Sequence, residues 1–183
     1  MVENIFTDQL PALVNQQDST YTLGTTFSSD IDGLILGTRI YVGAVPTSPS
    51  PTGLLYEATS RTTGILLASK PFGTLIAGEW NEVLFDDPVE ILAEQDYVTA
   101  WGPTNNYSAT GGFFDSADVI NGHLRALHTL FDRPNGKFNV GTSITFPGDT
   151  FNGGCYFVDT IFQLPGEESV SYLKNSFFFG AAV

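Results

Sequence analysis

The sequence predicts an all-β protein that folds as an antiparallel β-sandwich of the jelly-roll or immunoglobulin-like type. Three observations support this fold class. Short segments alternate between apolar and polar residues, with the period of two that a strand gives its side chains. Nineteen glycines and ten prolines separate these segments and supply turns. No long stretch has the helical period, so a parallel α/β sheet is not expected.

The segment 34–42 shows the pattern most clearly. Its alternation places Arg39 and Tyr41 on one face and four apolar residues on the other: Leu34, Leu36, Ile40 and Val42. Further strands are expected at residues 21–27, 53–58, 64–69, 80–85, 97–101, 137–140 and 156–164. The linking residues 46–51, 86–88 and 103–106 have the proline, asparagine and aspartate content of turns and loops. Residues 118–131 are the one region that could hold a helical turn or two.

The chain has the length of a single domain, and no composition change divides it. The proline- and serine-rich stretch 46–51 is too short and too early to link two domains. We expect the sandwich to comprise residues 1–165. Residues 166–183 then form a C-terminal extension, because Gly166, Glu167 and Glu168 interrupt the strand pattern.

The charge balance argues against one class of partner. Seven lysines and arginines stand against twenty aspartates and glutamates, which gives a formal net charge of −13. Such a surface repels phosphate backbones and anionic lipid, so nucleic-acid binding is not expected. No membrane insertion is expected either, since the most apolar stretch, residues 177–183, is too short to span a bilayer. The first eight residues lack the features of an export signal, which favours synthesis in the cytoplasm.

No catalytic constellation, metal site or cofactor site is apparent, so we do not expect an enzyme. His123 and His128 are five residues apart, which does not match the spacing of metal ligands on one helix face. The pair Asp30 and Asp32 lacks the later glutamate of a calcium loop, although calcium binding through scattered loops remains open. The lone Cys155 lies in an apolar run and is expected to be a buried, unreactive thiol.

An aromatic region between residues 101 and 114 has two interpretations. Exposed rings next to amide side chains would form a platform for stacking sugars, with six candidate residues: Trp101, Asn105, Asn106, Tyr107, Phe113 and Phe114. Alternatively most of these rings fill the core, which is the commoner role of aromatics in a sandwich and the interpretation we favour. Trp80, which begins an alternating segment, is also expected to be mostly buried.

An ordered series of short motifs resembles a known family. The motifs are Tyr21–Phe27, Gly37–Tyr41, Thr52–Tyr56, Gly64–Ser69, Gly78–Trp80, Asp96–Val98, Asn135–Phe138, Phe146–Pro147 and Tyr156–Phe162. In this order, across residues 5–164, they resemble a β-sandwich family of unknown function. That family occurs as a module of secreted bacterial proteins, notably actinobacterial ones, beside immunoglobulin-like and sugar-active domains. It has no established catalytic residues to transfer to this chain.

The resemblance implies a non-enzymatic role. A module of extracellular type that stands alone without an export signal fits a bacteriophage virion protein, made in the host cytoplasm and acting as capsid decoration or as a minor tail protein. Its partners would be other virion proteins, further copies of itself and host cell-surface glycans. The alternative is a carbohydrate-binding or adhesion module of a secreted bacterial protein, or the accessory domain of a secreted enzyme.

The C-terminal extension is the expected assembly element. Its candidate interface residues are Tyr172, Phe177, Phe178, Phe179 and Val183. Three successive phenylalanine rings left in water would promote aggregation, so burial in a neighbouring subunit is favoured. The alternative is that the segment folds back on its own domain as an edge strand.

Deletion of residues 171–183 separates these two interpretations. We expect the truncated protein to keep its melting temperature and to lose self-association, because the sandwich does not need the segment. Thermal unfolding and light scattering measure the two properties. A truncated monomer that unfolds would assign the segment to the core instead.

Overall fold

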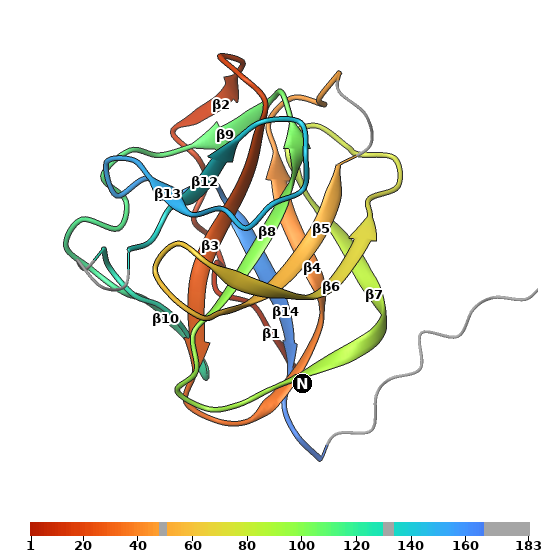
Figure 1. Cartoon of the computed structure of the whole chain (residues 1–183), viewed down its shortest axis with the longest axis vertical. Coiled ribbons are helices and arrows are strands. Elements are labelled where there is room, and N and C mark those ends of the chain that lie inside the picture. The colour runs from red at the N-terminus through yellow and green to blue at the C-terminus, as the bar shows by residue number, and fades with distance from the viewer. Residues whose placement is uncertain (48–50, 130–133, 167–183) are drawn as a thin grey trace, which may run out of the picture.

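A computed structural model, which describes residues 1–47, 51–129 and 134–166, shows two antiparallel sheets packed face to face (Figure 1). The predicted all-β sandwich is therefore confirmed. One sheet has the order β1-β14-β4-β7, formed by Val2–Glu3, Val158–Gln163, Gly33–Val42 and Glu79–Ile91. No described residue lies in a helix that could cross a bilayer.

The larger sheet has the order β10-β11-β3-β8-β5-β6, with β12 and β13 added beside β3. Its strands are Val119–Asn121, Leu124–Ala126, Tyr21–Ser29, Tyr97–Thr104, Thr52–Ala58, Gly64–Pro71, Lys137–Val140 and Asp149–Thr150. A short two-stranded ribbon, β2 (Leu13–Gln16) and β9 (Tyr107–Ala109), covers one end of the sandwich (Figure 1). Every expected strand is present, and six short strands were not predicted: β1, β2, β9, β10, β11 and β13.

Within the region 118–131, which the sequence suggested could hold a helical turn or two, residues 119–126 form a β-hairpin instead. Strands β10 and β11 pair across Gly122, which has a φ of 57°. A left-handed residue at the tip suits a tight hairpin turn, and glycine adopts that conformation at little cost. The local turn chemistry therefore overrode the weak helical pattern.

Strand β4 departs from the simple alternation expected of it. Its register against β14 and β7 shifts around residues 35–37, where the strand is bulged. As a result Ile35 is fully buried, whereas Leu34 and Leu36 are half-buried. Beyond the bulge, Ile40 and Val42 point into the core as predicted. A single bulge thus moves the buried face from odd to even positions.

Strand β7 is longer than predicted, because the expected turn at residues 86–88 lies inside it. The partners of Ile35 and Gly37 are Val89 and Leu84, so four residues of β7 lie opposite one residue of β4. Gly37 is required here, since a Cβ at this position would lie 2.1 Å from the carbonyl oxygen of Val83. The aspartates and proline of this segment form a wide irregularity of the strand, not a turn.

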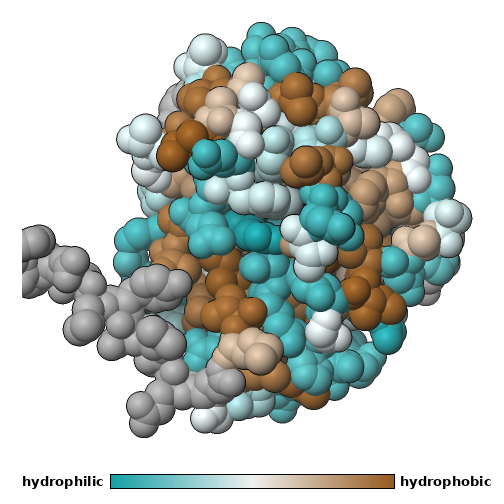
Figure 2. All heavy atoms as spheres, turned by 180° about the vertical axis from the view of Figure 1, so that it is seen from behind, coloured by the Kyte–Doolittle hydropathy of each residue, from teal (hydrophilic) through white to brown (hydrophobic). Residues whose placement is uncertain are grey.

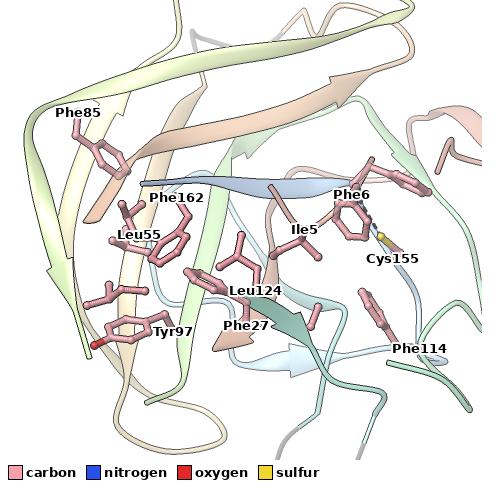
Figure 3. Close-up of a cluster of buried hydrophobic side chains, with 14 residues drawn as sticks. Ile5, Phe6, Phe27, Leu55, Phe85, Tyr97, Phe114, Leu124, Cys155 and Phe162 are labelled. Atoms are coloured by element: carbon pink, nitrogen blue, oxygen red, sulfur yellow. Dashed lines mark hydrogen bonds between the residues drawn. The ribbon is translucent and has the colours of Figure 1, made fainter. Parts of the chain in front are cut away.

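Aromatic and aliphatic side chains from both sheets fill the core (Figure 3). Phe27, Phe162 and Phe157 are buried between the layers. Trp80 is half-buried and packs against the core, and its ring lies 6.1 Å from that of Phe6. On the rear of the molecule, apolar side chains form several separate patches between polar ones (Figure 2).

A buried ion pair joins the N-terminal segment to the four-stranded sheet. Asp159 of β14 is fully buried, and both Nε and Nη2 of Arg39 donate to its Oδ2, at 2.9 and 2.7 Å. The backbone N–H groups of Ile5, Phe6 and Thr160 donate to the same carboxylate at 2.8, 3.0 and 2.7 Å. Burial raises the pKa of Asp159, and Arg39 and the N–H donors oppose that effect.

The Arg39 guanidinium has further contacts that hold it in place. Its Nη2 donates to the carbonyl oxygen of Phe6, and its Cζ lies 4.4 Å above the centre of a ring of Trp80. Across the sandwich, Thr99 Oγ1 of β8 donates to the carbonyl oxygen of Asp159 at 3.1 Å. The pair therefore connects the N-terminal segment, both sheets and the aromatic core.

The predicted assembly residues Tyr172, Phe177, Phe178, Phe179 and Val183 lie outside the described residues. Their role in assembly stays a prediction.

Replacing Arg39 with Met should destabilise the domain strongly. The substitution leaves a buried carboxylate without its cation, a loss that typically costs about 3–5 kcal/mol. The matched control is Lys70→Met, which removes a surface ion pair with Asp86, whose side chain is 78% exposed, and should cost less than about 1 kcal/mol. Urea unfolding midpoints compare the stability of the two variants. Equal destabilisation of both would show that the buried pair contributes no more to stability than the surface pair.

Candidate functional site

An aromatic pocket at the end of the sandwich covered by β2 and β9 is the first candidate site. It has a volume of about 260 Å³. Five aromatic side chains, one leucine and one aspartate line it: Tyr21, Tyr107, Phe138, Phe151, Tyr156, Leu23 and Asp18. This aromatic pocket is smaller than the sites that hold drug-sized molecules, and its size fits a single small ring.

The rings stand edge to face around the pocket. Tyr21 lies between Tyr107 and Phe138, with ring centroids 5.4 and 6.0 Å away. Tyr107 also contacts Tyr156, at 5.8 Å. Phe151 differs from the others, because 70% of its surface is exposed. The pocket thus combines a packed aromatic wall with one ring free to contact a ligand.

One carboxylate supplies the polar group of this pocket. The Tyr107 hydroxyl donates to Oδ1 of Asp18 at 3.1 Å. Burial, with Asp18 nearby, raises the pKa values of Tyr21 and Tyr107, and burial raises the pKa of Tyr156 to about 12. The three hydroxyls therefore stay protonated at neutral pH and can donate hydrogen bonds.

The local sequence explains how these residues meet. Tyr21 and Leu23 share one face of β3, and Phe138 of β12 lies directly opposite Leu23 in the sheet. Phe151 begins a tight turn in which Asn152 and Gly153 are both left-handed, with φ of 49° and 51°. The N–H of Gly154 donates to the carbonyl oxygen of Phe151 at 3.0 Å and closes this turn. The turn projects the phenylalanine ring away from the core.

The predicted sugar platform is not an exposed surface. Trp101 is 1% exposed and Asn106 is 2% exposed. Phe114 is fully buried in the core (Figure 3). This part of the prediction is wrong, and the favoured alternative, that the rings fill the core, is confirmed for Trp101 and Phe114. The cause is that β8 and the loop after β9 lie between other elements, so their rings have no free face.

The remaining three platform residues are half-buried and do not lie together. Phe113 packs on Phe6 and Phe157 in the core, and the amide of Asn105 bonds to Thr47. Tyr107 alone joins the aromatic pocket. The other pocket residues were missed, because only tertiary structure brings β3, β12 and the turn at Phe151 together.

A second pocket, of about 210 Å³, lies over the outer face of the larger sheet. Lys137 of β12 lines it and is only 2% exposed, and its Nζ donates to the carbonyl oxygen of Arg61 at 2.5 Å. The pKa of Lys137 is lowered to about 8, mainly by burial and also by the nearby charge of Arg61, while Asp149 opposes the shift. The amine fixes the turn between β5 and β6.

Other titratable groups form isolated pairs. The Nδ1 atoms of His123 and His128 each contact one carboxylate, that of Asp30 at 2.7 Å and that of Asp118 at 2.6 Å. Within the part of the chain that the structure describes, no three histidine, cysteine or acidic side chains converge to hold a metal ion. Burial raises the pKa of Cys155, which is consistent with an unreactive thiol.

Comparison with known families gives a match over most of the chain. The model of a family described as a domain of unknown function (DUF4082) matches residues 8–158. The match covers most of the chain and confirms the resemblance to a family of unknown function. No curated protein matches the chain.

The buried Lys137 predicts an unusual pH dependence of stability. Between pH 8 and about 10.5 the unfolded chain binds more protons at this lysine than the folded chain, so its contribution to the free energy of unfolding rises with pH. We therefore expect the free energy of unfolding of the wild type, minus that of Lys137→Met, to increase from pH 8 to about 10.5. Urea unfolding experiments measure both values. Taking the difference removes the effects of tyrosines and Cys155. A constant difference would contradict the lowered pKa.

Proposed function

Since the chain belongs to the family of domains of unknown function matched above, we propose that it is a non-catalytic domain that binds a saccharide in its aromatic pocket. The observation that carries this proposal is the pocket itself. Aromatic rings surround it, and Phe151 remains 70% exposed at its edge. A sugar ring has an apolar face that packs on aromatic rings, while its hydroxyls need hydrogen-bond partners such as those of Tyr107 and Asp18.

The charge of the protein narrows the class of saccharide. The chain has a net charge of −13, and the pocket contains the carboxylate of Asp18. Repulsion therefore disfavours uronic acids and other anionic sugars. The proposed ligand is a neutral or amino sugar, whose hydroxyl or ammonium groups donate hydrogen bonds to that carboxylate.

The composition of the pocket supports binding without catalysis. Glycoside hydrolysis ordinarily needs two carboxyl groups on either side of the scissile bond. Among the described residues that line the aromatic pocket, Asp18 is the one carboxylate, and it accepts a hydrogen bond from Tyr107. Such a site favours recognition over bond cleavage.

The setting in which the domain works is proposed from the sequence. A structural protein of a bacteriophage virion, in the capsid or the tail, would use the pocket to contact host cell-surface glycans and would assemble with other virion proteins and with its own copies. The alternative is a carbohydrate-binding module of a secreted bacterial protein. The same pocket serves either role.

The substitution Phe151→Ala tests the proposal. We expect wild-type protein to bind neutral or amino-sugar oligosaccharides on a glycan array, and the variant to bind the strongest of them about tenfold more weakly, a loss of about 1.4 kcal/mol. Isothermal titration calorimetry measures the change. Because the ring is largely exposed, the melting temperature should stay the same.

The matched control is Leu92→Ala, which truncates another apolar side chain, 63% exposed, outside the pocket. It should leave sugar affinity unchanged. If the array shows no binding, or if the two variants bind equally well, saccharide recognition at this pocket is wrong.

A further inference from the structure

A groove between the edge strands of the two sheets is distinct from the aromatic pocket and shares no lining residue with it. Strands β6 and β7 form its walls, and its volume is about 510 Å³. Its floor contains the apolar side chains of Leu67, Ala68, Phe85 and Val89. Phe85 is 7% exposed, whereas Leu67 is 36% exposed. The floor of this edge groove is therefore apolar and adjoins the hydrophobic core.

The irregularity of β7 creates this groove. On β4, Leu36 alone lies opposite residues 85–88 of β7. These extra residues of β7 line the groove together with residues of β6. Such an irregularity locally disrupts the ladder and re-aims the side chains of the longer strand. The groove is thus built into the sheet, not formed by a loop.

The other wall is an edge strand with an unusual surface. In the described chain, β6 pairs with β5 on one side and with no strand on the other. Three successive residues, Ile65, Leu66 and Leu67, are 56%, 45% and 36% exposed. An exposed apolar edge strand is a template for strand addition, which proteins normally block with charges or by covering the edge.

The rim of the groove is acidic. Asp86, Asp87 and Glu90 line it and are exposed. Lys70 of β6 bonds to Asp86 at 2.5 Å, which shows that a lysine amine fits this rim. A second copy of this chain is a poor occupant, since it has the same carboxylates and the same net charge of −13. A cationic segment complements the rim instead.

We propose that the edge groove binds an extended, basic segment of a partner protein, which adds as a strand to β6. Alternate side chains of an added strand point in opposite directions. One set, apolar, contacts the floor formed by Leu67 and Phe85; the other set, lysines or arginines, contacts Asp87 and Glu90. This inference does not depend on saccharide binding.

Fluorescence polarisation with a labelled peptide of alternating lysine and valine tests the proposal on the intact protein. We expect saturable binding at physiological salt and none for a peptide of alternating glutamate and valine. The double variant D87N/E90Q should weaken binding at least tenfold. The control D8N/D115N removes two exposed carboxylates outside the groove and should have little effect.

A second probe separates strand addition from simple charge attraction. N-methylation of alternate backbone amides keeps every charge but removes the N–H groups that pair with β6, so binding should be lost. Equal binding of the methylated peptide, or equal losses in the two double variants, would overturn the proposal. So would sedimentation showing that the free protein is a dimer that D87N/E90Q dissociates, since a second copy would then be the occupant.

Discussion

The buried carboxylate of Asp159 is the interaction on which the closure of the sandwich depends. A charge removed from water needs a cation and a full set of hydrogen bonds, and Arg39 with three backbone N–H groups supplies them. Because two of those N–H groups belong to Ile5 and Phe6, the N-terminal segment cannot leave without exposing or orphaning the charge. The buried carboxylate thus fixes where Ile5 and Phe6 lie.

This constraint extends from the ion pair into the core. Phe6 stacks on Trp80, and Arg39 covers a face of the same indole, so the charged and aromatic groups hold each other in place. The family match ends at residue 158, one residue before Asp159, and begins at residue 8, after Phe6. Ile5, Phe6 and Asp159, which close the sandwich, therefore lie just outside the matched region.

Both proposed binding surfaces arise where the regular sandwich is interrupted. The aromatic pocket forms at one end, where a left-handed turn projects Phe151 beyond the sheet. The edge groove forms where β7 takes up extra residues between Leu84 and Val89. Regular strands hide their apolar side chains between the layers, and these two interruptions leave some of them accessible.

The sequence by itself determined the fold class and most of the strands, because the period-two alternation and the turn residues are local signals. It determined the acidic surface as well. Tertiary structure alone decided which apolar residues are accessible. Trp101 and Phe151 are both aromatic residues beside turns, yet one is buried between strands and the other is exposed. Likewise, Asp159 is buried and Asp87 is exposed. Burial depends on what packs against a residue, which local sequence does not encode.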